Sequence, residues 1–112
     1  MNESIEKRVN CYSKEIVDLF LHLRSLIYKS SLEILESLWA NLPTYSCDSS
    51  FVRLIPFKDH INVEAKAVLD HKEELKGMKV TPKGMLQIYL NQNVPDDVLM
   101  MIFKETLSDD QE

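Results

Sequence analysis

The stretch FVRLIPFKDHINVEA, residues 51–65, decides the fold. Two apolar runs, Phe51 to Phe57 and His60 to Ala65, flank the dipeptide Lys58-Asp59. In the second run apolar and polar residues alternate strictly, which is typical of a strand with one covered face. We therefore predict a β-hairpin with Lys58-Asp59 as its two-residue connection. Pro56 has no N–H, so it favours an edge position or a bulge.

The residues after this hairpin predict a short helix and a third strand. The helix runs from Val68 to Lys76 and stops at Gly77, the residue type that commonly follows a helix C-terminus. Thr81-Pro82-Lys83-Gly84 has proline and glycine placed for a type I turn. Met85 to Leu90 is the third strand.

Two helices are expected before the hairpin. The first spans Ser4 to Lys29, because apolar residues recur every three or four positions without Gly or Pro. The same spacing suits a coiled-coil seam, and this alternative stays open. Ser30 and Glu33 form a capping-box pattern that starts a second helix, and Pro43 ends it. The buried face of this second helix would consist of Leu32, Leu35, Leu38 and Trp39.

The predicted order of elements is α-α-β-β-α-β-α in one domain over residues 1–112. Thr44 to Ser50 is a loop or a short edge strand, and Pro95 begins the last helix. Ser108 to Glu112 is expected to be a frayed tail. Short connections favour antiparallel pairing, so we predict a two-layer α+β fold in which helices cover an antiparallel sheet of three or more strands.

Charge and composition exclude several classes of function. The net charge of -5 falls entirely on Asp96 to Glu112, and the rest of the 112-residue chain is neutral overall. No concentrated basic face is visible, so nucleic-acid binding is not expected. No apolar run is long enough to span a membrane, and no secretory signal is visible. Cys11 and Cys47 form no C-x-x-C motif and are read as free thiols, which favours a cytoplasmic location.

Two groups of residues have ligand types that metals accept. His60 and Glu64 lie on the polar side of the second strand, but at ~3.3 Å per residue they are about 13 Å apart. A metal there would need partners from other elements, and the alternative is a solvated strand face. His71 and Glu74 are neighbours on a helix at i, i+3. They could hold a divalent ion weakly, or they could form an exposed helix face.

The chain resembles the YdhG-like family of small bacterial domains from about Tyr12 to Leu107. The resemblance is carried by five segments: residues 39–45 (WANLPTY), residues 57–61 (FKDHI), Leu75-Lys76-Gly77, Lys83-Gly84 and Val94-Pro95. One member of this family is a frataxin-like intracellular iron chaperone, and most members have no assigned activity. The resemblance implies the two-layer α+β fold and a non-enzymatic function.

The first function that the resemblance implies is an iron chaperone. Such a protein binds ferrous iron loosely and supplies it to iron–sulfur or haem assembly proteins. The acidic C-terminal region offers Asp96, Asp97, Asp109 and Asp110 as metal ligands. The alternative is that Asp96 and Asp97 stabilise a helix N-terminus and that the others aid solubility. No tightly bound cofactor is expected, and the chain would be a monomer or a weak homodimer.

The second function is a module that binds a small anionic ligand. The resemblance implies that seven residues converge on its pocket: Trp39, Tyr45, Phe57, Lys58, His60, Lys83 and Gly84. Lysine, imidazole and phenol groups would hold the anion between aromatic walls. The alternative is that the two aromatic walls belong to the core and that the lysines are exposed. No nucleophile elbow and no phosphate-binding glycine loop is present, so no catalytic residues are expected.

Overall fold

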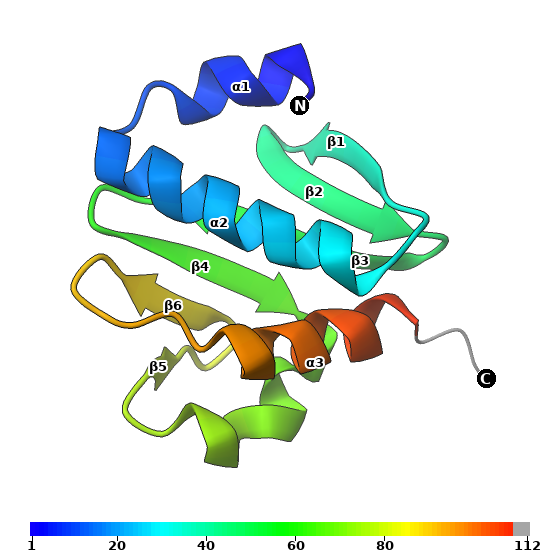
Figure 1. Ribbon diagram of the computed structural model, residues 1–112, viewed down its shortest axis with the longest axis vertical. Coiled ribbons are helices and arrows are strands. Elements are labelled where there is room, and N and C mark those ends of the chain that lie inside the picture. The colour runs from blue at the N-terminus through cyan, green and yellow to red at the C-terminus, as the bar shows by residue number, and fades with distance from the viewer. Residues whose placement is uncertain (109–112) are drawn as a thin grey trace.

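Six antiparallel strands form one open sheet in the order β1-β2-β3-β4-β6-β5, and helices cover one face of it (Figure 1). This computed structural model describes residues 1–108. The predicted fold class, a two-layer α+β arrangement with an antiparallel sheet, is confirmed.

The elements follow one another with short connections. The strands are β1 (Leu35–Trp39), β2 (Leu42–Cys47), β3 (Ser50–Pro56), β4 (His60–Ala65), β5 (Lys79–Val80) and β6 (Leu86–Tyr89). The helices are α1 (Glu3–Val9), α2 (Lys14–Ser30), the 3₁₀ helix η1 (Lys66–Leu75) and α3 (Asp96–Leu107). Ser108 caps the C-terminus of α3, and the rest of the predicted frayed tail lies outside the described residues.

The β3–β4 hairpin has the predicted form. The N–H of Phe57 donates to the carbonyl oxygen of His60 at 2.8 Å, so Lys58-Asp59 is the two-residue connection. Pro56 was expected at an edge or a bulge, but β3 is an inner strand. The pairing of β2 with β3 extends only to Arg53, so Pro56 lies beyond the part of β3 that pairs with β2. Its missing N–H therefore costs no hydrogen bond to β2.

The two glycines occupy the positions that the sequence indicates. Gly77 follows η1 with φ of 87°, a left-handed conformation that glycine adopts without a steric penalty. Gly84 has φ of 88°, and its N–H donates to the carbonyl oxygen of Thr81 at 2.8 Å. This bond closes the predicted turn before β6. The short helix between β4 and this turn is present as η1, although it is a 3₁₀ helix and starts at Lys66.

The expected first helix is divided in two. The side chain of Asn2 caps α1 by accepting from the N–H of Ser4 at 2.8 Å. The hydroxyl of Ser13 caps α2 by accepting from the N–H of Ile16 at 3.2 Å. Because a side-chain cap satisfies a free N–H at a helix start, Ser13 begins a new helix without any Gly or Pro. The prediction of one helix from Ser4 to Lys29 was therefore wrong.

The expected second helix is the β1–β2 hairpin, so the predicted order of elements was also wrong here. Trp39 pairs with Leu42, and the two residues between them, Ala40 and Asn41, have φ of 49° and 66°. Two successive positive φ values are typical of the tightest hairpin turn. Pro43 lies within β2 instead of ending a helix. The segment from Thr44 that was read as a loop or an edge strand is mostly an inner strand.

The core lies between the sheet and the helices α1, α2 and α3 (Figure 1). Alternate residues of the inner strands point into it, including Val52, Leu54, Ile61 and Val63, all fully buried. At the β1 end, Arg24 of α2 bonds the carboxylate of Glu36 at 2.6 Å. Burial opposes ionisation of Glu36, but hydrogen bonds from Arg24 and from the N–H of Asn2 keep its pKa below the usual value.

Candidate ligand-binding site

The face of the sheet opposite the helices carries a buried cation, Arg53 of β3. Thr44, Arg53 and Glu64 are cross-strand partners on β2, β3 and β4, so their side chains lie in one row. Arg53 Nε donates to Thr44 Oγ1 at 3.0 Å, and its Nη1 donates to Glu64 Oε1 at 2.9 Å. Arg53 is only 8% exposed, so the guanidinium is largely withdrawn from water.

Two aromatic rings enclose this guanidinium. The Arg53 Cζ atom lies 4.2 Å from the ring centroid of Trp39 and 4.2 Å from that of Phe51. Both distances are within the range of a cation–π interaction. Arg53 thus fixes two rings that come from different strands.

The larger hollow beside this row has a volume of 620 Å³ and is called the lysine hollow. Its lining includes Ser49, Phe51, Lys66, Leu69, Lys83 and Gly84. A side chain at position 84 would be strained, because Gly84 has φ of 88° and a Cβ atom there would lie 3.2 Å from Leu69 Cγ. Lys83 is exposed and makes no ion pair within residues 1–108. The hollow thus combines two ammonium groups with the apolar side chains of Phe51 and Leu69.

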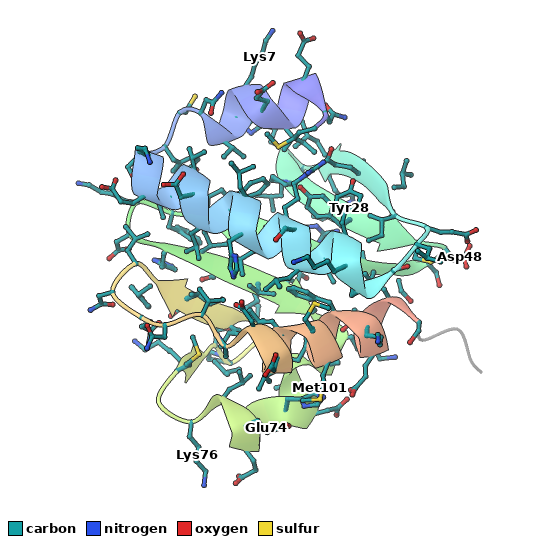
Figure 2. The ribbon with its side chains drawn as sticks, in the orientation of Figure 1. Lys7, Tyr28, Asp48, Glu74, Lys76 and Met101 are labelled. Carbon is teal, nitrogen blue, oxygen red and sulfur yellow. The ribbon has the colours of Figure 1, made fainter. Side chains whose placement is uncertain are left out.

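A second hollow of 550 Å³ adjoins the first and is called the tryptophan hollow. Its lining includes Trp39, Thr44, Ser49, Ser50, Phe51 and Arg53. Ser49, Ser50 and Phe51 line both hollows, so the two lie side by side at the turn between β2 and β3. Asp48 marks this turn in Figure 2 and has a positive φ of 55°. A hollow with cationic side chains therefore adjoins a hollow with an aromatic wall.

The structure brings together only part of the predicted pocket. Lys83 and Gly84 line the lysine hollow, and Trp39 lines the tryptophan hollow. Tyr45 lies on the other face of the sheet, fully buried against Tyr28 of α2, with 5.9 Å between ring centroids (Figure 2). Burial raises the pKa of the Tyr45 phenol, so it stays neutral. Tyr45 thus belongs to the helix-covered core.

The remaining predicted pocket residues lie at the opposite end of β4. Five residue steps separate His60 from Ala65 at the lysine hollow, or about 16 Å along the strand. The His60 ring is stacked between Phe57 and Tyr89, with centroid distances of 4.6 and 4.5 Å. Its Nδ1 lies 2.8 Å from Asp59 Oδ1. Lys58 is exposed at the hairpin tip. This group is separate from both hollows.

The structure describes two of the four predicted metal ligands, Asp96 and Asp97. Asp96 Oδ1 lies 2.8 Å from Nε2 of His22 on α2, and Asp97 is exposed at the start of α3. Asp109 and Asp110 lie outside the described residues. Within residues 1–108, no three His, Cys, Asp or Glu side chains are grouped so that they could hold a metal ion.

His71 joins η1 to α3 through two carboxylates. Its Nδ1 lies 2.5 Å from Glu74 Oε1, and its Nε2 lies 2.9 Å from Glu105 Oε1 on α3. The hydrogen bond to Glu105, and then that to Glu74, raises the pKa of His71 above its ordinary value. Both ring nitrogens face acceptors, which favours the doubly protonated imidazolium. Figure 2 shows Glu74 on η1, below α3.

Sequence reasoning missed Ser49, Phe51, Arg53 and Lys66 as site residues. Strand alternation over residues 51–57 does place Phe51 and Arg53 on one side of β3, and this was the available signal. Nothing in the local sequence indicates that Trp39 lies on the same side, because that requires β1 and β2 to be recognised as strands.

None of the helices in residues 1–108 has the length and apolar character needed to cross a membrane. No protein-family model, no curated protein and no solved structure matches the chain. The function of the two hollows is therefore argued from their own geometry and charge.

Proposed function

We propose that the protein is a non-enzymatic module that binds a small organic anion in the lysine hollow. The observation that carries this proposal is the 620 Å³ hollow lined by Lys66 and Lys83 together with Phe51 and Leu69. Sites for small molecules commonly enclose roughly 300–1,000 Å³ and combine apolar walls with a few polar groups. The hollow has both properties.

The charges around the hollow favour an anion. Glu64 is the one carboxylate in its lining, and Arg53 neutralises it through the ion pair at 2.9 Å. Lys83, which makes no ion pair within residues 1–108, then leaves an uncompensated positive charge at the hollow, although the whole chain has a net charge of -5. An ammonium group is a strong donor to carboxylate or phosphate oxygens. The hydroxyl of Ser49 adds a neutral donor at the same wall.

The apolar walls favour an organic anion over a simple inorganic one. Phe51 and Leu69 line the hollow, and Leu69 is 54% exposed. A ligand with an apolar body would remove this surface from water, which contributes roughly 25 cal/mol per Å² buried. Carboxylates and phosphate monoesters with a small hydrocarbon group share the required chemistry.

Thermal denaturation with a set of anions tests the proposal. We would compare acetate, phenylacetate, inorganic phosphate and phenyl phosphate at equal ionic strength. A ligand that binds only the folded state stabilises it by RT ln(1 + L/Kd), where L is the ligand concentration, so the melting temperature rises with the ligand concentration relative to Kd. We expect phenylacetate or phenyl phosphate to stabilise the wild type more than acetate or phosphate does.

Two matched variants test whether the ligand-induced rise in melting temperature comes from binding at the lysine hollow. Lys83→Ala removes an ammonium group from the hollow, whereas Lys58→Ala removes an equally exposed one from the β3–β4 hairpin tip. We expect Lys83→Ala to lose most of the ligand-induced stabilisation and Lys58→Ala to keep it. Equal stabilisation of the wild type and of Lys83→Ala would contradict the proposal.

The iron chaperone, and with it membership of the YdhG-like family, stays a prediction. It is supported by the imidazole of His22 beside Asp96, two ligand types that ferrous iron accepts, and by the acidic C-terminal region. Anaerobic calorimetry with ferrous iron would test it. Saturable binding that is reduced in Asp96→Asn, Asp97→Asn would support this function, and an absence of binding to the wild type would contradict it.

A further inference from the structure

We infer that the ligand carries a planar aromatic group joined to its anion, and that this group stacks on Trp39 in the tryptophan hollow. This inference rests on the proposed function, because the anionic end of the same molecule would occupy the lysine hollow. Ser49, Ser50 and Phe51 line both hollows, so the two are close enough for one molecule to contact both.

Trp39 is placed as an open aromatic platform. It is 59% exposed, although tryptophan is among the residues that gain most from burial. The Arg53 guanidinium already contacts its ring, with Cζ 4.2 Å from the centroid. The exposed part of the indole lines the tryptophan hollow and is available to a second ring. Aromatic pairs prefer stacked or edge-to-face arrangements at such sites.

Arg53 orders this platform and is not itself available to an anion. Its charge is already paired with Glu64 at 2.9 Å, and its Nε donates to Thr44 at 3.0 Å. The guanidinium is buried between Trp39 and Phe51, so an anion could reach it only by breaking these contacts. Each hollow therefore binds a different part of the ligand. The anion binds in the lysine hollow, and the ring binds the indole of Trp39 in the tryptophan hollow.

Phe51 determines which kind of chemical group can connect the anion of the ligand to its ring. Its ring contacts Arg53 at 4.2 Å from the centroid and contributes to the lining of both hollows. The part of a ligand that crosses from one hollow to the other therefore passes an apolar surface. A short apolar or aromatic connection fits this position, and a charged one would lose hydration without gaining a partner.

The single tryptophan of the chain makes the inference directly measurable. Trp39 is the only source of an indole N–H signal in a ¹H–¹⁵N correlation spectrum of the full chain. We would titrate the protein with phenyl phosphate and, as the matched probe without a ring, with n-butyl phosphate, and measure both affinities by calorimetry. We expect phenyl phosphate to shift the indole signal and to bind about three- to tenfold more tightly than n-butyl phosphate.

Two substitutions of Trp39 separate stacking from general packing. Trp39→Phe keeps an aromatic ring and should retain most of the preference for phenyl phosphate. Trp39→Leu should bind both probes with equal affinity, and circular dichroism would confirm that it is folded. If the wild type binds both probes equally and the indole signal does not move, the inference fails while the proposed function stands. If neither probe binds the wild type, both fail.

Discussion

Arg53 contributes to both the stability and the site of this protein. Its guanidinium pairs with Glu64, donates to Thr44 and lies between the rings of Trp39 and Phe51. A buried charge of this kind is tolerated only when it is paired and hydrogen-bonded. The packing of its alkyl stem adds to the polar contacts. Arg53 therefore orders the part of this face that carries Trp39, Thr44, Phe51 and Glu64.

Replacing Arg53 by alanine should lower the free energy of unfolding by about 2–4 kcal/mol, because the change removes an ion pair, a hydrogen bond and the packing between two rings. Urea denaturation would measure the loss. Lys14→Ala is the control, because the Lys14–Asp18 pair is on the surface, where ion pairs contribute little to stability. A loss of similar size in the two variants would contradict the role given to Arg53.

The sequence predicts the side of β3 on which Arg53 lies, but not its partners. Phe51, Arg53 and Ile55 alternate with the core residues Val52 and Leu54, and the two-residue period of a strand predicts this division without a structure. Trp39 and Thr44 were assigned to a helix and to a loop or edge strand, so they could not be placed beside it. Lys83 and Gly84 were identified through the resemblance to the YdhG-like family, because this Lys-Gly pair is one of the segments that carry it.

At the scale of elements, the β1–β2 hairpin is the main departure from the expected fold. Leu35, Leu38 and Trp39 have helical spacing, yet Leu35 and Trp39 are 66% and 59% exposed in β1. The turn at Ala40-Asn41 lacks the glycine that usually identifies such a connection. Helical propensity and the missing turn signal favoured the same wrong interpretation. Pairing with β2, a tertiary interaction, determines the observed strand.

Ala40→Gly distinguishes the two interpretations of this segment. In the hairpin, residue 40 has φ of 49°, where a Cβ atom is unfavourable and glycine is not. We expect the substitution to raise the free energy of unfolding by about 0.5–1 kcal/mol. In a helix, the same change would lower it by about 1 kcal/mol.

Urea denaturation checks this prediction as well. Lys7→Gly introduces the same residue into the interior of α1 and should be destabilising by about 0.7–1 kcal/mol. If Ala40→Gly lowers the stability as Lys7→Gly does, the hairpin turn is contradicted.

At the scale of the whole molecule, His71 connects η1, which contributes Leu69 to the lysine hollow, with α3. The pKa of His71 is raised by Glu105 and Glu74, above its ordinary value of 6.5. A raised histidine pKa stabilises the folded state fully below the unfolded pKa. This stabilisation is lost as the pH rises through the folded pKa. The contribution of His71 to the free energy of unfolding is therefore expected to decrease as the pH rises above 6.5.

Comparison with His71→Asn isolates this contribution. The free energy of unfolding of the wild type, minus that of the variant, should be larger at pH 6 than at pH 9. The rest of the chain is identical in the two proteins, so the other contributions to the pH dependence cancel. Urea denaturation at the two pH values provides the measurement. A difference that stays constant or grows towards pH 9 would contradict the ion pairs of His71.

Mapping of backbone amide shifts during a phenyl phosphate titration would show whether the protein binds an organic anion at the two hollows. We expect saturable shifts concentrated at Ser49, Ser50 and Gly84, which line the hollows. Shifts centred instead on the Lys58-Asp59 hairpin tip or on the start of α3 at Asp96, or no saturable shifts at all, would contradict it.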